Sequence, residues 1–545
     1  MKNHKILSCA LILAASALCL AGCTFFDKKA SAMKQEIPKI SFAYWDIDNL
    51  QDSSSPDNIT DLLEKKFNFD ASFQSFDWKI YKEQYQVLAA TGNLPDVFTN
   101  VLLSSNDAND SALYNQMIEQ RMLHSLPEDL SDYPNLQAFL SDYEYLRHED
   151  GHFYAIPHPL YAEDILSSSD SAMLVRKDWM EALDIQIPQN IDDFISMAAA
   201  FAKEDPDANG IDDTIGYNVN NLAALGKWVM LGIAPECNVY SWIEDTDGVY
   251  RPCWMTDSFR NVITTYRMLY ESGGLDPDFY AKNSAIVLND FTSGKLGAME
   301  YKSSAFPLAE LEEMWNSKNS LPFDSCVSII PIFPAPDGTH YSNSSNTFWS
   351  ETYISSSVSD DELKVILSLM DYLLSEEGTT LYNYGILNTD YTFNSEENPV
   401  SLIAEGNSSH IIKLMQKYPS IKLWSNLVPR GWDYSDFENN AETRFLYNKE
   451  CISLTQQALT FCEENTVQID RPYDFLLYPK EHSSFSNTAF DSFIKCIIGK
   501  EDPLTMWDRA LTSMEAQGLS EYVARQNQSY QESLKGKSKY FSRRF

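Results

Sequence analysis

Along the first part of the chain, apolar residues recur with two different periods, that of a strand and that of a helix. The alternation over 39–45 predicts a strand, because a period of two places apolar side chains on one face of a sheet. The pattern then predicts a helix over 58–69, a strand over 73–76, a helix over 78–90 and a strand over 94–98. Strands that alternate with helices indicate an α/β fold with parallel pairing.

A second strongly patterned segment begins at Leu174. It predicts a strand and a short helix that ends near Pro188, followed by a helix capped by Asn190, with Asp193 at the N3 position. The apolar face of the second helix follows a helical spacing of four, seven and eight residues and consists of Phe194, Ala198, Phe201 and Ala202.

Two helices are predicted at the C-terminal end. Thr505 and Asp508 match a capping box, so the first helix is expected to start at Thr505. Its apolar stripe would consist of Trp507, Leu511 and Met514. Gly518 can end this helix, and the last helix is expected over residues 519 to about 534.

The N-terminal residues indicate an exported, lipid-anchored protein. Two lysines precede an uncharged, mostly apolar run over 6–21, which is shorter than the roughly 20 residues that span a bilayer and is typical of a signal peptide. The run ends in Leu-Ala-Gly-Cys (20–23), which resembles the lipobox of bacterial lipoproteins. The resemblance implies that residues 1–22 are removed, that Cys23 is acylated, and that 23–36 form a tether at the extracytoplasmic face of the cell membrane. A plain secretory signal with an incidental cysteine is the alternative.

Length and charge limit the remaining possibilities. About 510 residues remain after the signal, enough for two lobes rather than one core. The formal charge of −37 becomes −39 when Lys2 and Lys5 are removed. Such a chain is repelled by nucleic acid, which we therefore exclude as a partner. The acidic residues are spread along the chain, as is typical of a solvated surface.

The cysteines do not indicate a zinc site. Without Cys9, Cys19 and Cys23, no CxxC pair remains among the six others, which are Cys237, Cys253, Cys326, Cys451, Cys462 and Cys496. An extracellular protein can form disulfides, but spacing does not give their pairing. Disulfides and buried thiols both remain open.

His148 to His152 formally match the HExxH signature of zinc proteases. That chemistry requires both histidines on one face of a continuous helix. Asp150-Gly151 inside the motif instead favours a turn, and 153–157 is typical of a strand. We therefore predict a hairpin rather than a zinc site.

An acidic loop at 205–216 has the spacing of an EF-hand-like calcium site. Side-chain oxygens recur at alternate positions, and Gly210 stands where the sharp turn is needed. The predicted ligands are Asp205, Asp207, Asn209, the Ile211 carbonyl and Asp213. Gly216 replaces the usual bidentate glutamate at position 12, and an Asp/Asn/Gly turn without metal is the alternative. The expected role of the calcium ion is structural.

Five segments together resemble the family-1 extracellular solute-binding proteins of bacterial sugar ABC importers. They are the lipobox, ATGNLPDVF (90–98), GHFYAIP (151–157), the block 174–217, and FTSGKLGAMEY (291–301). The resemblance implies an α/β, two-lobed periplasmic-binding-protein-like fold (type II) with a hinge, and a calcium loop like that of alginate-binding relatives. We expect 37–157 with about 291–350 to form lobe 1, and 158–290 with about 351–545 to form lobe 2.

The resemblance also implies a function without catalysis. The protein would be a monomer that captures a carbohydrate, favoured as an oligosaccharide, and delivers it to the permease subunits of an ABC transporter. The alternatives are a binding protein for a peptide or another solute, and, less favoured, a secreted glycoside hydrolase, which would need paired carboxylates.

Aromatic residues make up 13% of the chain and supply the candidate sugar platforms. Position and residue type select seven ligand-binding candidates: Trp45, Asp48, Trp228, Trp242, Tyr301, Trp349 and Trp424. Asp48 would accept hydrogen bonds from sugar hydroxyls, and the rings would stack on sugar faces. For each tryptophan, core packing is the alternative.

Overall fold

The computed structural model describes residues 37–50, 57–104, 108–159, 171–220, 226–237, 242–245, 247–343, 348–431, 436–463, 466–469 and 485–535. Contacts divide the chain into two units, 1–37 and Pro38–Phe545, and every element described below belongs to the second unit. Within these ranges, no helix has the length and apolar character needed to cross a membrane.

The first sheet has the strand order β2-β1-β3-β12-β4. Its strands are β1 (Lys39–Trp45), β2 (Asp70–Phe76), β3 (Val97–Asn100), β4 (Ile156–Pro159) and β12 (Phe348–Ile354). β1 pairs in parallel with β2 and β3, as the alternating pattern predicted. β12 lies antiparallel between β3 and β4, although it follows them by about two hundred residues.

The second sheet has the order β10-β5-β9-β6. Its strands are β5 (Ala172–Arg176), β6 (Ile215–Asn218), β9 (Leu296–Tyr301) and β10 (Val327–Ile330). β5 pairs antiparallel with β9 and β10, and β6 pairs in parallel with β9. Three two-stranded pairs complete the strands: β7 (Trp242–Glu244) with β8 (Tyr250–Pro252), β11 (Tyr341–Asn343) with β15 (Val467–Ile469), and β13 (Tyr391–Phe393) with β14 (Pro399–Ser401).

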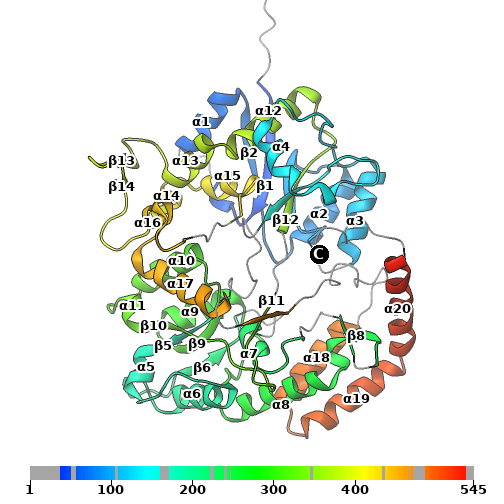
Figure 1. Ribbon diagram of the computed structural model, residues 1–545, viewed down its shortest axis with the longest axis vertical. Helices are drawn as coiled ribbons and strands as arrows, with labels where there is room; N and C mark the ends of the chain where they lie inside the picture. The colour runs from blue at the N-terminus through cyan, green and yellow to red at the C-terminus, as the bar shows by residue number, and fades with distance from the viewer. Residues whose placement is uncertain are drawn as a thin grey trace, which may run out of the picture. The chain divides into compact units, whose positions relative to one another are not determined.

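Two groups of helices surround the two sheets (Figure 1). The helices around the first sheet are α1 (Asn58–Phe67), α2 (Tyr81–Thr91), α3 (Ala108–Glu119), α4 (Pro134–Ser141), α12 (Asp360–Leu373), α13 (Glu376–Tyr384) and α15 (Ile421–Leu427). Those around the second are α5 (Lys177–Ala182), α6 (Ile191–Lys203), α7 (Lys227–Leu231), α8 (Asp257–Glu271), α9 (Ser284–Thr292), α10 (Ala305–Asn316), α11 (Phe323–Cys326), α17 (Lys449–Glu463), α18 (Phe485–Ile498), α19 (Pro503–Glu515) and α20 (Leu519–Lys535). α14 (His410–Lys417) contacts both α13 and α10, and α16 (Ala441–Leu446) contacts α14 and α17.

Strand pairing corrects the predicted division into lobes. We placed about 291–350 in lobe 1, but β9 and β10 are strands of the second sheet, and only β12 joins the first. We placed about 351–545 in lobe 2, but α12 packs on α1 and α4 and therefore belongs with the first sheet. Partner strands are chosen by contacts between distant segments, which leave no trace in local periodicity.

Helix capping confirms one predicted start and corrects another. The Asn190 side chain accepts a hydrogen bond from the Asp193 backbone N–H and caps α6, as predicted. The helix expected to start at Thr505 begins earlier, at Pro503, and Asp502 caps it. Proline is favoured in the first turn because it lacks the N–H that would be unsatisfied there. Thr505 therefore lies at N3, where its backbone N–H donates to Asp502.

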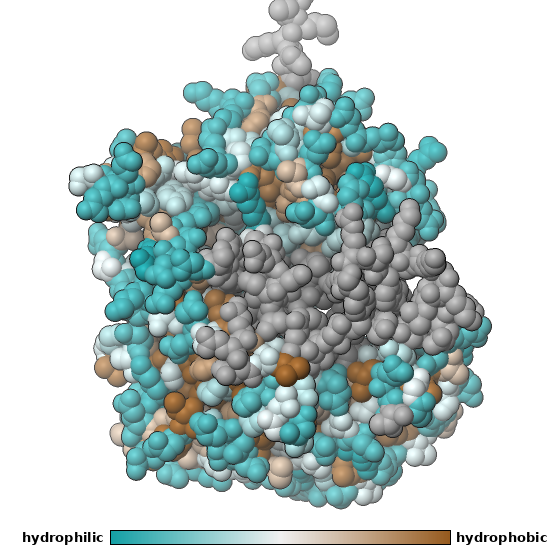
Figure 2. Space-filling view, in the orientation of Figure 1, coloured by the Kyte–Doolittle hydropathy of each residue, from teal (hydrophilic) through white to brown (hydrophobic). Residues whose placement is uncertain are grey.

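The cysteines and the surface complete the description. All six cysteines after Cys23 are buried as thiols, which confirms one of the two alternatives left open by their spacing. Figure 2 shows mainly hydrophilic residues over the coloured part of the face in view, as expected for acidic residues spread over a solvated surface.

Candidate functional site

Four aromatic side chains come together where β1 and β2 end. Trp45 is the last residue of β1, Trp78 follows β2, Tyr81 opens α2, and Trp349 lies in β12. The register of β1 on β2 pairs Trp45 with Phe76, so the parallel strands bring both segments to the same edge. We call these four residues the aromatic cluster.

The ring of Trp45 lies at the centre of the cluster. Its centroid is 4.8 Å from that of Trp78, 5.4 Å from Tyr81 and 5.5 Å from Trp349. Trp78 stacks on Tyr81 at 5.2 Å. Trp45 is only 3% exposed, whereas Trp78 is 47% exposed. The cluster therefore has a buried base and an aromatic surface open to solvent.

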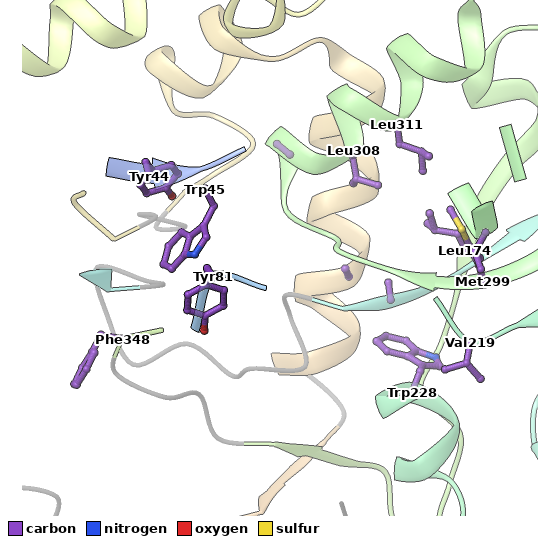
Figure 3. Packing of buried hydrophobic residues seen from close by; sticks show 14 of the residues in the cluster. Tyr44, Trp45, Tyr81, Leu174, Val219, Trp228, Met299, Leu308, Leu311 and Phe348 are labelled. Carbon is purple, nitrogen blue, oxygen red and sulfur yellow. The ribbon is translucent and has the colours of Figure 1, made fainter. Parts of the chain in front are cut away.

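The indole nitrogen of Trp45 is one of three buried indole nitrogens without an acceptor in the described residues, with those of Trp179 and Trp254. Nε1 is buried, yet it donates no hydrogen bond within the described part of the chain. Buried indole N–H groups normally find an acceptor, because an unmade bond costs about 1–3 kcal/mol. A ligand oxygen would supply that acceptor once the neighbouring rings move to open a path to Nε1. Figure 3 shows Trp45 beside Tyr44 and Tyr81.

Lys422 connects this edge of the first sheet to groups from the second. Its Nζ on α15 donates to the Asp46 carbonyl at 2.9 Å, directly after Trp45. Crowding by surrounding protein raises the pKa of Glu310 on α10, and the charges of Lys422 and Lys302 oppose this. Burial, and secondarily Glu310, raises the pKa of Tyr301 at the end of β9. Tyr301, Glu310 and Lys422 are thus neighbours in sequence-distant elements.

The structure separates the seven predicted ligand-binding residues into four groups. Trp45 and Trp349 meet in the aromatic cluster, and Asp48 is exposed three residues after Trp45. Tyr301 is half-buried beside Glu310. Trp242 is nearly buried and packs against Tyr522, with ring centroids 5.8 Å apart.

Trp228 and Trp424 are packed in the core. Trp228 is fully buried, and its Nε1 donates to the Pro331 carbonyl at 3.1 Å. Figure 3 places it beside Val219, in the group of residues that includes Leu174 and Met299. Trp424 packs edge-on against Phe42, and its Nε1 donates to the Thr60 hydroxyl at 3.2 Å. Other parts of the protein cover both rings, so Trp228 and Trp424 follow the core-packing alternative.

The HExxH match forms a turn, not a helix. The Gly151 N–H donates to the His148 carbonyl, and the His148 N–H donates to the His152 carbonyl, each at 2.9 Å. This confirms the predicted turn and places the histidines on a reversing backbone. The predicted hairpin does not form, because the next strand, β4, begins at Ile156 and pairs with β12. In the described ranges, no group of three or more His, Cys, Asp or Glu side chains is arranged to hold a metal ion.

The acidic loop at 205–213 gathers its oxygens around tight backbone turns. Gly210 has φ +78°, as predicted for the sharp turn. Asp205 accepts from the Asn209 and Gly210 N–H groups, at 3.2 and 3.0 Å. The Asn209 amide contacts Asp207 at 2.8 Å and Asp213 at 3.4 Å. Partial burial raises the pKa of Asp207, and Asp205 and Asp213 raise it further. A bound cation would relieve this repulsion, so the residue types fit calcium in part, without the position-12 ligand. In this structure the three aspartates, like the rest of the described residues, are not arranged as a metal-holding group.

Comparison with known proteins identifies the family. A family model described as "Bacterial extracellular solute-binding protein" matches residues 58–394, more than half of the chain. The chain belongs to this family. The sequence resemblance to extracellular solute-binding proteins is therefore confirmed.

Two relatives of this solute-binding protein come from Bacillus subtilis (strain 168). Lipoprotein LipO is 23% identical over 538 residues, which cover 96% of this chain and 98% of LipO. The polygalacturonan/rhamnogalacturonan-binding protein YtcQ is 25% identical over 406 residues, which cover 73% of this chain and 77% of YtcQ.

Solved structures confirm the predicted two-lobed fold. The Streptococcus pneumoniae ABC-transporter substrate-binding protein FusA in complex with kestose superimposes with a TM-score of 0.64 at 17% identity, covering 92% of this chain and 100% of FusA. An alginate-binding protein without calcium ion also gives 0.64, at 16% identity and the same coverage.

Sequence analysis missed Trp78 and Tyr81 because it placed 78–90 inside one helix. The helix begins only at Tyr81, and Trp78 lies in the turn before it. The sequence contained a usable signal, because Trp45 ends one strand of the predicted parallel pair and Trp78 follows the other. The carboxyl ends of parallel strands lie at one edge, where α/β proteins bind ligands.

His158, next to the cluster, predicts a specific pH dependence of stability. Its ring lies 6.1 Å from that of Trp349, and its nitrogens contact Ser350 Oγ at 2.7 Å and Thr352 Oγ1 at 2.8 Å. Burial lowers the pKa of His158 to about 3. The unfolded chain takes up this proton below about pH 6.5 and the folded protein only near pH 3, so stability falls as the pH falls through this window.

We expect His158→Asn to weaken this acid sensitivity. Between about pH 6.5 and pH 4.5 the variant should lose about 2 kcal/mol less free energy of unfolding than the wild type, because it lacks the titrating ring. Urea denaturation at each pH measures the difference. His124→Gln, at a half-buried histidine that contacts a backbone carbonyl, serves as the control. Parallel pH profiles for His158→Asn and the wild type would contradict the assignment.

Proposed function

We propose that this solute-binding protein captures a carbohydrate, in the form of an oligosaccharide, outside the cell and delivers it to an ABC transporter without chemical change. The observation that carries the proposal is the aromatic cluster, with its exposed Trp78 ring and the unsatisfied Nε1 of Trp45. Sugars combine apolar C–H faces with hydroxyl groups, so a sugar site needs flat aromatic surface and a few directed polar groups.

The relatives support this choice of ligand class. YtcQ is named for binding polygalacturonan and rhamnogalacturonan. FusA of Streptococcus pneumoniae serotype 4 is named as a fructooligosaccharide ABC transporter substrate-binding protein and is 24% identical over 62% of this chain. Both names describe binding proteins rather than enzymes, which supports a function without catalysis. A peptide or another solute is the alternative ligand, and hydrolysis of the sugar would favour the glycosidase alternative.

The proposed ligand contacts come from both sheets. Trp45, Trp78 and Trp349 would stack on the sugar, and Asp48 would accept hydrogen bonds from its hydroxyls. Tyr301, at the end of β9 in the second sheet, and Trp242, on β7 of a two-stranded pair, stay predicted contacts. Closure of the two lobes on the ligand would exclude water, and the difference in affinity between the open and closed forms would drive it.

We expect Trp78→Ala to weaken oligosaccharide binding at least about tenfold, because the variant removes the exposed platform. Its melting temperature should change little, since the ring is half exposed. Trp45→Phe keeps a ring and removes the N–H, and should weaken binding by about 1 kcal/mol. Titration calorimetry with a ligand identified from an oligosaccharide panel measures both.

Phe393→Ala is the matched control, because Phe393 is 52% exposed on β13 and lies outside the cluster. Its affinity should equal that of the wild type. Unchanged affinity in both Trp78→Ala and Trp45→Phe would show that the ligand binds elsewhere.

The proposed calcium ion would lie among Asp205, Asp207, Asn209 and Asp213, with the Ile211 carbonyl. An ion there would stabilise the loop between α6 and β6 by neutralising its carboxylates. We expect added calcium to raise the melting temperature, with about 2.7 kcal/mol of stabilisation at a hundredfold excess over the dissociation constant. Asp207→Asn should abolish the shift, and Asp212→Asn, in the same loop but outside the ligand set, should keep it. If added calcium leaves the melting temperature of the wild type unchanged and elemental analysis finds no metal, the loop is a turn without a bound ion.

The proposed lipid anchor is Cys23, which lies outside the described residues. The Leu-Ala-Gly-Cys motif and the similarity to the lipoprotein LipO support it. Cys23→Ala is expected to leave the folded part intact and to release the protein from membranes or leave an unprocessed precursor. Labelling of cells with a lipid precursor measures the change. Equal labelling of the variant and the wild type would rule out this anchor.

A further inference from the structure

We infer that the site selects an uncharged oligosaccharide, and that the carboxylates around the aromatic cluster exclude sugar acids such as uronates. This inference rests on the proposed carbohydrate function and specifies its substrate class. It follows from the charges of the residues next to the cluster and from the partners of the nearby cations.

Exposed carboxylates accompany the cluster in sequence. Asp46 and Asp48 follow Trp45, and Asp77 precedes Trp78. All three side chains are exposed, in the same two segments that carry the aromatic rings. A carboxylate near a neutral sugar accepts hydrogen bonds from its hydroxyls, whereas near a uronate it repels a like charge.

A carboxyl group also lies buried near the base of the cluster, and burial raises its pKa. Glu351 is fully buried two residues after Trp349 on β12 and accepts the Leu102 N–H at 3.0 Å and the Ser104 N–H at 2.6 Å. Burial raises the pKa of Tyr81, and the charges of Asp110 and Glu351 raise it further. A second anion near the Tyr81 hydroxyl would meet the same repulsion in a poorly solvated place.

One cation near the cluster is paired with a carboxylate, since Lys82 Nζ lies 2.5 Å from Asp110. Lys422 Nζ donates to the Asp46 backbone carbonyl and keeps its positive charge, but the exposed carboxylates of the two segments that carry the cluster outnumber it. The imidazole of His158 is neutral at physiological pH, as its pKa of about 3 requires. Lys79 is exposed, but the segments after β1 and after β2 together carry three exposed carboxylates.

The chain also supplies no guanidinium to these segments. Arg121 is the first arginine in the sequence, after the ends of β1, β2 and β3 and the start of α2. Arginine binds carboxylates through two parallel hydrogen bonds, the arrangement expected where uronates are recognised. In the described part of the cluster, the groups exposed to a ligand are therefore aromatic faces and carboxylate acceptors. This set suits hydroxyls and disfavours an additional negative charge.

The name of the relative YtcQ shows which result would contradict the inference. Polygalacturonan, in its name, is a polymer of a sugar acid, and YtcQ is 25% identical to this chain. If this protein used the same ligand class, uronate oligomers would bind at least as tightly as neutral ones. Charge at the site, rather than family membership, therefore decides between the two outcomes.

The experiment screens the full chain on an array of neutral oligosaccharides, including kestose, and uronate oligomers, including trigalacturonate, in the presence of a chelator. Calorimetry then measures the best ligand of each class at about 50 and about 500 mM NaCl. We expect the neutral ligand to bind at least about tenfold more tightly, with an affinity that changes less than about twofold with salt. Tighter uronate binding, or a steep loss of affinity with salt, would overturn the inference.

A pair of double variants tests whether local charge is the cause. Asp46→Asn with Asp77→Asn should reduce the discrimination against trigalacturonate several-fold. Asp360→Asn with Asp361→Asn removes the same charge from exposed positions at the start of α12 and should preserve the discrimination. Equal effects of both double variants would overturn the local explanation. If no oligosaccharide binds while a peptide or another solute does, the proposed function fails and this inference fails with it.

Discussion

Strand β12 brings polar side chains into the middle of the first sheet, and their need for buried partners organises the surrounding structure. Ser350 and Thr352 hydrogen-bond to the two nitrogens of His158 on β4. Thr352 also donates to the Leu427 carbonyl at 2.8 Å, which fastens the end of α15 to the sheet. Glu351 holds the segment after β3 through two backbone N–H groups. Removing one member would leave a buried partner unsatisfied, so these elements are expected to hold one another in place.

The aromatic cluster depends on that arrangement. Trp349 stands on β12 directly before the residues of this network, while Trp45 and Trp78 come from the ends of β1 and β2. The pairing of β1 with β2 brings Trp45 and Trp78 together, and Trp349 joins them because β12 returns to the first sheet. The cluster combines a rigid base with an exposed ring, which is the arrangement expected of a site whose geometry is formed before the ligand arrives.

Charge and stability are linked at this site. The buried His158 stays neutral and Glu351 stays buried because neighbouring hydroxyl and N–H groups satisfy them. The exposed Asp46, Asp48 and Asp77 keep full access to water. At the proposed site, these exposed carboxylates would set the electrostatic potential that a ligand meets.

The sequence by itself determined the local elements and the family. Alternation over 39–45 and the parallel pairing of the first three strands were correct, although both sheets also contain antiparallel pairs. Asn190 capped its helix, and the dispersed motifs led to the solute-binding proteins. Only the tertiary structure decided that Trp424 and Trp228 are packed in the core while Trp78 is exposed, and that Leu296–Tyr301 pairs in the second sheet rather than the first. The physical reason is the range of the interactions. Periodicity and capping act over a few residues and are readable in one segment, whereas burial of a tryptophan and the choice of a strand partner depend on which distant segment packs against them.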